Sequence, residues 1–411
     1  MNVNENLVKK QKNEEEEFEE VEDIEIEEEE REKQSSSHGS SDDSAKKKLM
    51  KMMAFIVAGA VILIFILFIL SLFTKKKYEY EDIEEVLATA AESYFKDYPD
   101  SLPGEDGDIV EIDSSNLVAA GKMKDLSEYL PEGVACSGTV QVEKSGSEYL
   151  YTPFLNCGEN YTTVELYKKI VNDDDIVTSG DGLYSRGGAY YFRGEYVNNY
   201  VKMDNSLWRI VKVTSDDNIV LIHANGLDYS QPWDNRYNES MLYEAGINNY
   251  SISRVREYLE RIYDEPVADD GEDILSKKDK ARLVNYNVCT GKRAINSETK
   301  DNSEECKEVL RDQKMGLLTL SDYLYASLDP NCKSAGTRSC MNYNYLSIDD
   351  EWWLVTANSQ NTATAYMVNQ DGVVEANTTA DYSKIRPVVY LNSKVLLKKG
   401  KGTEKDPYIL K

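Results

Sequence analysis

Hydrophobic and polar positions are distributed very unevenly along this chain. The stretch 52–73 is apolar throughout and contains no charged residue. As a helix rising about 1.5 Å per residue it would be roughly 33 Å long, which is enough to cross the hydrocarbon core of a bilayer. Lysines flank it on both sides, as they commonly do at membrane interfaces. The pattern predicts one transmembrane helix over 52–73.

The next region has the periodicity of a helix with one apolar face. Between 78 and 98 apolar residues recur every three or four positions, and Pro99 and Pro103 end the pattern. The segments expected to cover this face are a helix over 117–130 and strands at 138–144 and 149–155. Together they predict a small membrane-proximal domain over 78–165.

A second domain is expected over 183–411, after a linker at 166–182 that contains an Asp-rich stretch. Its expected elements are a hairpin at 207–224, a helix at 253–263, a strand at 315–319 leading into a short helix capped by Ser321, strands at 351–358 and 364–376, and a final strand pair within 386–410. The predicted fold class is therefore α+β: one transmembrane helix, a small α+β domain, and an antiparallel β domain with helices.

Charge separates the first 51 residues from the rest. The whole chain has a formal net charge of −27, and its first segment contains the acidic runs Glu14–Glu17 and Glu27–Glu30 beside a serine-rich stretch. Such a segment repels itself and has little to bury, so we expect 1–51 to be a disordered cytoplasmic tail. The remainder is also acidic, which makes nucleic acid an unfavourable partner.

The cysteines predict where the large domain lies. All six follow the apolar stretch, and their even number and close spacing suit three local disulfides. The expected pairs are Cys136 with Cys157, Cys289 with Cys306, and Cys332 with Cys340. Zinc is the alternative, but the chain has no C-x-x-C motif and few histidines, so no metal site is expected. Disulfides place the cysteine-bearing part in an oxidising compartment outside the cytoplasm.

Catalytic signatures are largely missing from the sequence. Only His223 offers an imidazole outside the acidic tail, and it lies in an apolar run typical of a core strand. No nucleophile elbow, phosphate-binding loop or dinucleotide fingerprint occurs. The acidic stretch 269–273 lacks the ligand spacing of a calcium loop. We therefore expect no catalytic, cofactor-binding or metal-binding residues.

Two resemblances extend this interpretation. The apolar stretch followed by "LATAAESYFKDYP", "SSNLVAAGKMKDL" and "YLYTPFLNCGENYTT" resembles the exported part of type IV pilin-like proteins of Gram-positive bacteria, over about 52–163. The chain lacks the family's prepilin cleavage pattern, and lysines at 75–77 interrupt the helix. This resemblance implies a pilin-like membrane-proximal domain and the alternative role of a structural pilus component.

The region 183–411 resembles an uncharacterised bacterial surface domain of the C-type-lectin-like class, related in fold to formylglycine-generating enzymes. The resemblance rests on motifs that include "NNYVKMDNSLWRIV", "GLLTLSDYLYAS", "YMVNQDGVV" and "GTEKDPYIL". It implies a binding or adhesion module and, as a further alternative, an oxidase. An oxidase would need free thiols at Cys332 and Cys340.

A recognition surface is the remaining expectation. The chain has 29 Tyr, and Tyr, Asn and Ser make adaptable contacts at low entropic cost. The candidate ligand-binding residues are Trp233, Tyr343, Tyr345, Trp353 and Asn358. The competing interpretation is that genome composition enriches Tyr and Asn everywhere and that the tryptophans belong partly to the core. The predicted protein is a single-pass protein of the bacterial plasma membrane that displays a module for a glycan, cell-wall polymer or surface protein.

Overall fold

A computed structural model describes Met53 and residues 78–172, 176–239, 246–265 and 274–411. The chain divides into two compact units, Met1–Lys76 and Lys77–Lys411, of which the second holds nearly all described residues. The acidic tail and the apolar stretch 52–73, apart from Met53, lie outside the described residues. No helix within the described ranges is long and apolar enough to span a bilayer.

The predicted fold class was wrong. The described chain is mostly β with few helices, and it does not support one transmembrane helix followed by a pilin-like α+β domain. The sequence-based prediction gave too much weight to helical periodicity. For example, the helix expected over 117–130 is limited to α4 (Ser114–Ala119) and a short 3₁₀ turn, η2 (Leu126–Glu128). Gly121 adopts φ +68° just after α4, a left-handed conformation that stops the helix.

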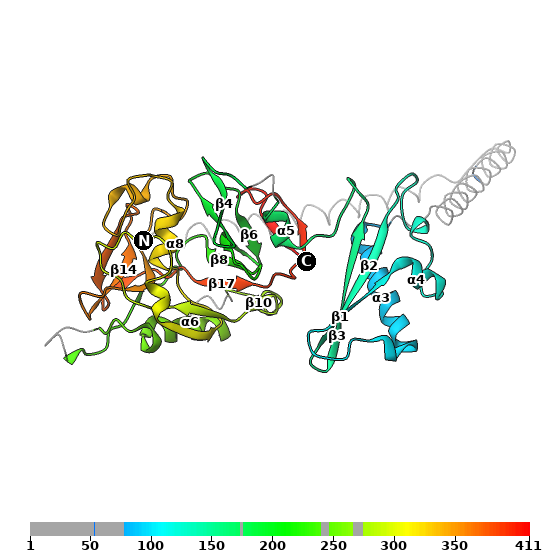
Figure 1. The fold of residues 1–411 in the computed structure, drawn as a ribbon, viewed down its shortest axis with the longest axis horizontal. Helices are drawn as coiled ribbons and strands as arrows, with labels where there is room; N and C mark the ends of the chain where they lie inside the picture. The colour runs from blue at the N-terminus through cyan, green and yellow to red at the C-terminus, as the bar shows by residue number, and fades with distance from the viewer. Residues whose placement is uncertain (1–52, 54–77, 173–175, 240–245, 266–273) are drawn as a thin grey trace, which may run out of the picture. The chain divides into compact units, whose positions relative to one another are not determined.

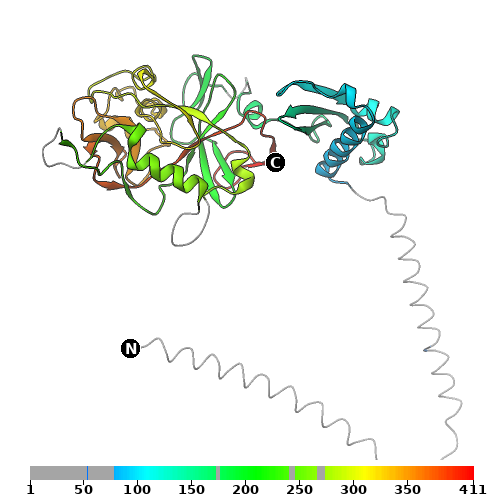
Figure 2. The same ribbon diagram turned by 90° about the horizontal axis from the view of Figure 1, so that it is seen from below.

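Residues 78–165 form a helix packed on a small sheet. The elements are α3 (Tyr80–Asp97), β1 (Ile109–Asp113), β2 (Ser137–Ser145) and β3 (Glu148–Asn156). The strands are antiparallel in the order β1-β2-β3, and α3 lies along the sheet (Figures 1 and 2). The helix approaches β2 so closely that a Cβ at Gly138 would lie 2.8 Å from Leu87. A larger residue at position 138 would therefore force the Leu87 side chain to shift.

Residues 166–411 form a larger, strand-rich region with its own hydrophobic core. Its strands are β4 (Gly182–Arg186), β5 (Ala189–Arg193), β6 (Tyr200–Met203), β7 (Ser206–Val213), β8 (Ile219–His223), β9 (Gln231–Pro232), β10 (Leu283–Val284), β11 (Tyr286–Cys289), β12 (Val309–Gln313), β13 (Trp352–Ala357), β14 (Thr364–Val368), β15 (Val374–Thr378), β16 (Tyr382–Ser383), β17 (Val388–Leu391), β18 (Leu397–Lys399) and β19 (Tyr408–Leu410). Its α-helices are α5 (Leu166–Ile170), α6 (Arg254–Asp264), α7 (Lys277–Lys280) and α8 (Leu320–Ala326). The predicted linker at 166–182 thus includes α5, whose apolar side chains enter this core.

The main sheet has nine strands, seven of them in the order β10-β17-β8-β7-β6-β19-β18. The β4–β5 hairpin joins it because β5 pairs with β7. The predicted hairpin at 207–224 is confirmed as β7 and β8. At the end of the chain, β19 pairs with β18 and runs parallel to β6, so the last strands close against the beginning of this region.

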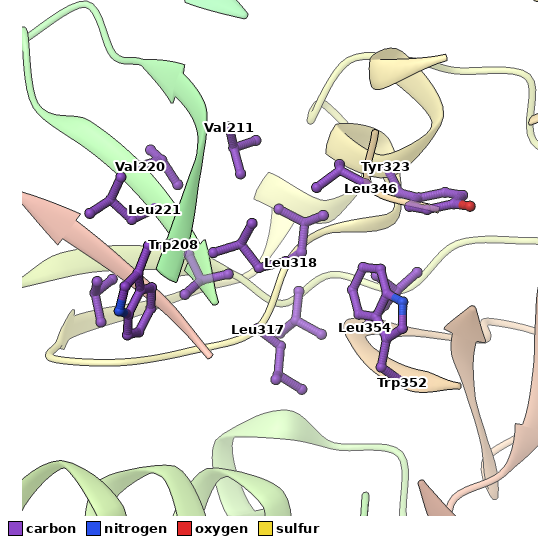
Figure 3. Packing of buried hydrophobic residues seen from close by; sticks show 14 of the residues in the cluster. Trp208, Val211, Val220, Leu221, Leu317, Leu318, Tyr323, Leu346, Trp352 and Leu354 are labelled. Carbon is purple, nitrogen blue, oxygen red and sulfur yellow. The ribbon is translucent and has the colours of Figure 1, made fainter. Parts of the chain in front are cut away.

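A three-stranded sheet of β13, β14 and β15 shares the core with the main sheet. Figure 3 shows Leu317 and Leu318 lying between Trp208 of the main sheet and Trp352 of the smaller sheet. All four side chains are buried. The strand predicted at 315–319 is not formed, since only Gly316 makes a bridge, to Val388. This segment instead crosses the core as an irregular connection between the two sheets.

Two predicted helices are present. α6 begins at a Ser253 cap, whose side chain accepts a hydrogen bond from the Arg256 amide, and its apolar face enters the core. α8 follows the irregular segment, but its cap is Thr319 instead of Ser321. Ser321 is buried and bonds to Glu305.

All three predicted disulfides are confirmed: Cys136–Cys157, Cys289–Cys306 and Cys332–Cys340. The first joins the residue before β2 to the residue after β3, where the two strands pair. The second joins the paired β11 to the turn η6 (Glu305–Lys307). No cysteine is free in the described chain.

Candidate functional site

The five ligand-binding residues predicted from sequence do not form one exposed site. Trp233 and Trp353 are fully buried, Tyr345 and Asn358 are nearly so, and only Tyr343 is well exposed, at 58%. A ligand arriving from solvent therefore meets Tyr343 among the five.

The buried members of this set have internal partners. Trp233 donates its indole N–H to the carbonyl of Leu354 at 2.9 Å, and Trp353 donates to Gln231 at 3.0 Å. The Tyr345 hydroxyl donates to the carbonyl of Ile210 at 3.2 Å. These contacts satisfy the polar atoms of side chains in the core.

The surroundings of His223 are those of a core side chain and do not suggest a catalytic base. Its Nδ1 lies 2.7 Å from the Asn225 carbonyl, and its ring packs edge-on against Trp208 at 5.1 Å. Burial lowers the pKa of His223, so the imidazole is neutral at physiological pH. Cys332 and Cys340 are bonded to each other. In the described ranges no group of three or more His, Cys, Asp or Glu side chains is placed to hold a metal ion.

A cavity of about 570 Å³ lies beside α4 in the first region. It is lined by Asp113 and Asp125, by several hydroxyl side chains and by the disulfide-bonded Cys136. Thr139 donates to Asp113 at 3.0 Å, and the Ser127 hydroxyl donates to Asp125 at 2.5 Å. Because its lining carries two carboxylates and no cation, this cavity disfavours anionic ligands.

A different surface arises from the β4–β5 hairpin. Its turn contains Gly187 and Gly188, both at positive φ, and its register places Tyr184 opposite Tyr191. Side chains two residues apart on a strand share a face. Arg186, two residues after Tyr184, therefore lies on this face with the two tyrosines.

Arg193 lies on the same face of β5, two residues after Tyr191. Both arginines of the hairpin contact the ring of Tyr325, near the end of α8. The guanidinium carbons of Arg186 and Arg193 each lie 4.4 Å from the centre of the Tyr325 ring. Arg193 also lies 4.7 Å from the centre of Tyr184, and Tyr191 meets Tyr325 edge-on at 5.0 Å. These contacts between rings and guanidinium groups hold the side chains in place.

We call this the tyrosine–arginine surface. It consists of Tyr184, Arg186, Tyr191, Arg193, Lys300 and Tyr325.

Main-chain contacts fix Arg193 within this surface. Its Nε donates to the Tyr325 carbonyl at 2.7 Å, and its Nη2 donates to the Ser327 carbonyl at 2.9 Å. The guanidinium thus ties the hairpin to the end of α8. The ring of Tyr191 is backed by Lys212, whose ammonium lies 5.3 Å from the ring centre.

Lys300 adds a third cation. The Arg186 Nη1 donates to the Lys300 carbonyl at 3.2 Å, which brings the two residues together. Burial lowers the pKa of Lys300, and repulsion from Arg193 and Arg186 lowers it further. Within the described chain the Lys300 ammonium has no hydrogen-bond partner. It is therefore a half-buried cation held beside two others.

Two carboxylates lie near these cations. Asp301 comes within 3.9 Å of the Arg186 Nη2, and its side chain is 55% exposed. Asp329 interacts electrostatically with Lys300. Its oxygens accept hydrogen bonds from the Asn331 amide at 2.8 Å and the Asn342 side chain at 2.7 Å. These carboxylates offset part of the positive charge.

Tyr343 adjoins the same surface. Its carbonyl accepts a hydrogen bond from the Leu328 amide at 3.2 Å, one residue after the Ser327 carbonyl that holds Arg193. The preceding residue, Asn342, bonds to Asp329. Thus one residue predicted from the tyrosine-rich segments lies beside the site, whereas the six residues of the surface itself were not predicted.

A signal for four of these six was present in the sequence. "YSRGGAYYFR" places Tyr and Arg at alternate positions on both sides of a Gly-Gly turn, a pattern that puts all four on one face of a hairpin. No local pattern connects them to Lys300 or Tyr325.

Comparison with models of protein families, with curated proteins and with solved structures finds no match to this chain.

Proposed function

We propose that this chain carries a ligand-binding or adhesion module that works outside the cytoplasm, and that its ligand is held on the tyrosine–arginine surface. The candidate ligands are a glycan, a cell-wall polymer or a surface protein. Three disulfides support the location, because such bonds persist in oxidising compartments.

The observation that carries the proposal is a set of half-buried tyrosine rings already ordered before any ligand arrives. Tyr184, Tyr191 and Tyr325 are fixed by ring and guanidinium contacts. The hydroxyls of Tyr191 and Tyr325 make no hydrogen bond to any described residue. Rigid aromatic side chains with a free polar group bind ligands at low entropic cost.

The binding test uses the full chain on an array of glycans, wall polymers and surface proteins. Tyr325→Ala removes the ring that both arginines contact, and we expect it to weaken binding about tenfold, the upper range of a cation–π and stacking loss. Tyr237→Ala is the matched control, because Tyr237 is 65% exposed and lies outside the surface. Equal binding by wild type and Tyr325→Ala would show that the ligand sits elsewhere.

A second pair of variants distinguishes a loss of binding from a loss of folding. Tyr325→Phe keeps the ring and removes only the hydroxyl, and Tyr343→Ala trims an exposed neighbour of the surface. We expect both to fold normally and to weaken binding by a smaller factor than Tyr325→Ala. If neither changes binding while both melt like the wild type, the surface is not the binding site.

The location is tested on intact cells with a membrane-impermeant amine reagent. Lys398 and Lys399 are exposed on β18, so they should be labelled without lysis. Labelling that requires lysis would place the module inside the cell and remove the basis of the proposal.

A further inference from the structure

We infer that the tyrosine–arginine surface recognises a phosphate group carried by an extracellular polymer, through Arg186, Arg193 and Lys300. This inference rests on the proposed function, since it names the chemistry of the ligand at the same surface.

Several cationic donors of this surface have no hydrogen-bond partner within the described chain. Arg186 Nη1 donates a hydrogen bond to the Lys300 carbonyl. Arg193 Nε and Nη2 donate to the carbonyls of residues 325 and 327. Arg186 Nε, Arg193 Nη1 and Lys300 Nζ have no hydrogen-bond acceptor among the residues that the structure describes. Cationic donors of this kind make short, strong bonds to oxyanions.

The charge of this surface also favours an anionic ligand. The chain carries a net charge of −27, yet Arg186, Arg193 and Lys300 are gathered here. The carboxylates of Asp301 and Asp329 interact with these cations, and Asp181 interacts with Tyr184. Burial and the two arginines lower the pKa of Lys300, so its charged form is less stable than that of a free lysine. An anion bound beside Lys300 would reverse this effect. The acidic remainder of the chain repels polyanions, so any that bind must do so through a local site.

The placement of the donors suits a tetrahedral anion. The donors come from three separate segments: β4, β5 and the loop that contains Lys300. A phosphate presents several oxygens in a tetrahedron and accepts from several directions, whereas a carboxylate presents two in a plane. The tyrosine rings beside the cations suit the apolar part of a polymer that carries the phosphate.

The test measures binding of the full chain to three polymers of similar length. These are poly(glycerol phosphate), polygalacturonate as a carboxylate polymer, and dextran as a neutral one. We expect poly(glycerol phosphate) to bind most tightly. Inorganic phosphate should compete with it, and chloride at the same ionic strength should compete much less.

Lys300→Gln tests the assignment of the residue. It removes the charge of a side chain that makes no described hydrogen bond, so the fold should be unaffected. We expect binding of poly(glycerol phosphate) to weaken about tenfold, as for loss of one hydrogen bond to a charged group. Lys399→Gln is the matched control, since it makes the same charge change at an exposed position on β18.

The outcomes are distinct. Equal binding of dextran and the phosphate polymer, with no effect of Lys300→Gln, would overturn this inference and leave the proposed function standing. Tighter binding of polygalacturonate would overturn the choice of phosphate. Binding to phosphatidylglycerol vesicles without binding to the polymer would show that a lipid headgroup is the source and would overturn the polymer. If no glycan, polymer or protein binds at this surface, both proposals are wrong.

Discussion

Replacing Asp322 with Asn tests how α8 is held on the main sheet behind the proposed site. Lys212 on β7 contacts both carboxylate oxygens of Asp322, at 2.8 and 3.0 Å. The two side chains are only 8% and 6% exposed. Asp322→Asn keeps the size of the side chain and removes its charge, so the Lys212 ammonium stays buried without a counter-charge.

The expected loss follows from the environment of the pair. At 2.8 Å and an effective dielectric constant of about 20, the gross attraction is about 6 kcal/mol. Desolvation of the two ions offsets much of this in the intact pair, but removing one partner typically costs about 3–5 kcal/mol. For a region of this size each kcal/mol lowers Tm by about 2–4 °C. We therefore expect Tm to fall by roughly 6–20 °C.

Differential scanning calorimetry on the full chain measures this fall. Asp264→Asn is the matched control, since its partner Lys314 forms an exposed pair at 3.1 Å with side chains 63% and 48% exposed. Such a pair contributes at most about 1 kcal/mol. If the two substitutions lower Tm equally, burial does not govern the Lys212–Asp322 pair and the reasoning is refuted.

The pH dependence provides a second test of the same pair. In the wild type, burial works against the charged form but Asp322 raises the pKa of Lys212 above its ordinary value. Without Asp322 only burial acts, so the folded pKa falls below the unfolded one and stability rises with pH. The deficit of Asp322→Asn should therefore shrink between pH 7 and 9, by at most about 1.4 kcal/mol per pH unit. A deficit independent of pH would contradict the buried-charge explanation.

Three further predictions concern other parts of the chain. Replacing Cys289 and Cys306 by Ser removes a disulfide that spans 17 residues. We expect the free energy of unfolding to fall by about 3 kcal/mol. Calorimetry of the variant and of the wild type, with and without reductant, measures this fall. Gly138→Ala should cost about 1–3 kcal/mol by forcing a Cβ against the Leu87 side chain. An unchanged Tm would show that the Leu87 side chain shifts without cost. Burial lowers the pKa of His223. As the pH falls, the unfolded state therefore binds the proton before the folded state does, and stability should decrease below about pH 6.5. The denaturant midpoints at pH 7.5 and 5.5 should differ less in His223→Gln than in the wild type.

The features that sequence analysis placed correctly depend on neighbours in the chain. The β7–β8 hairpin follows from two apolar runs around a polar turn, and α6 follows from helical spacing after Ser253. The disulfide pairs were also local, since each pair spans a short stretch of chain. In each case the interactions that decide the structure lie within one short window of sequence.

Where the prediction of local structure was wrong, a competing interaction decided the outcome. Both Thr319 and Ser321 are good helix caps by composition. Thr319 caps α8 by accepting from the Asp322 amide, whereas Ser321 is used in the core, where it bonds to Glu305 and Arg293. A buried arginine and glutamate need such a partner, and the sequence does not reveal that they lie there.

The tryptophans illustrate a similar limit for the binding residues. An aromatic side chain in a strand can face either the core or the solvent, and the outcome depends on which distant strands cover it. Trp233 bonds to Leu354 and Trp353 to Gln231, each more than a hundred residues away in sequence. Aromatic content alone therefore predicted recognition residues in segments that the fold uses for packing.

The same limit explains why the tyrosine–arginine surface needed the structure. The hairpin presents two arginines on one face, but separate exposed arginines are ordinary on a protein surface. Their contact with Tyr325 and the approach of Lys300 join segments more than a hundred residues apart. Burial, and then repulsion from Arg193 and Arg186, lowers the pKa of Lys300, so bringing these three cations together carries an electrostatic cost. An anionic ligand would reduce this repulsion, which supports the proposal that the cluster binds one, although Arg193 also ties the hairpin to the end of α8.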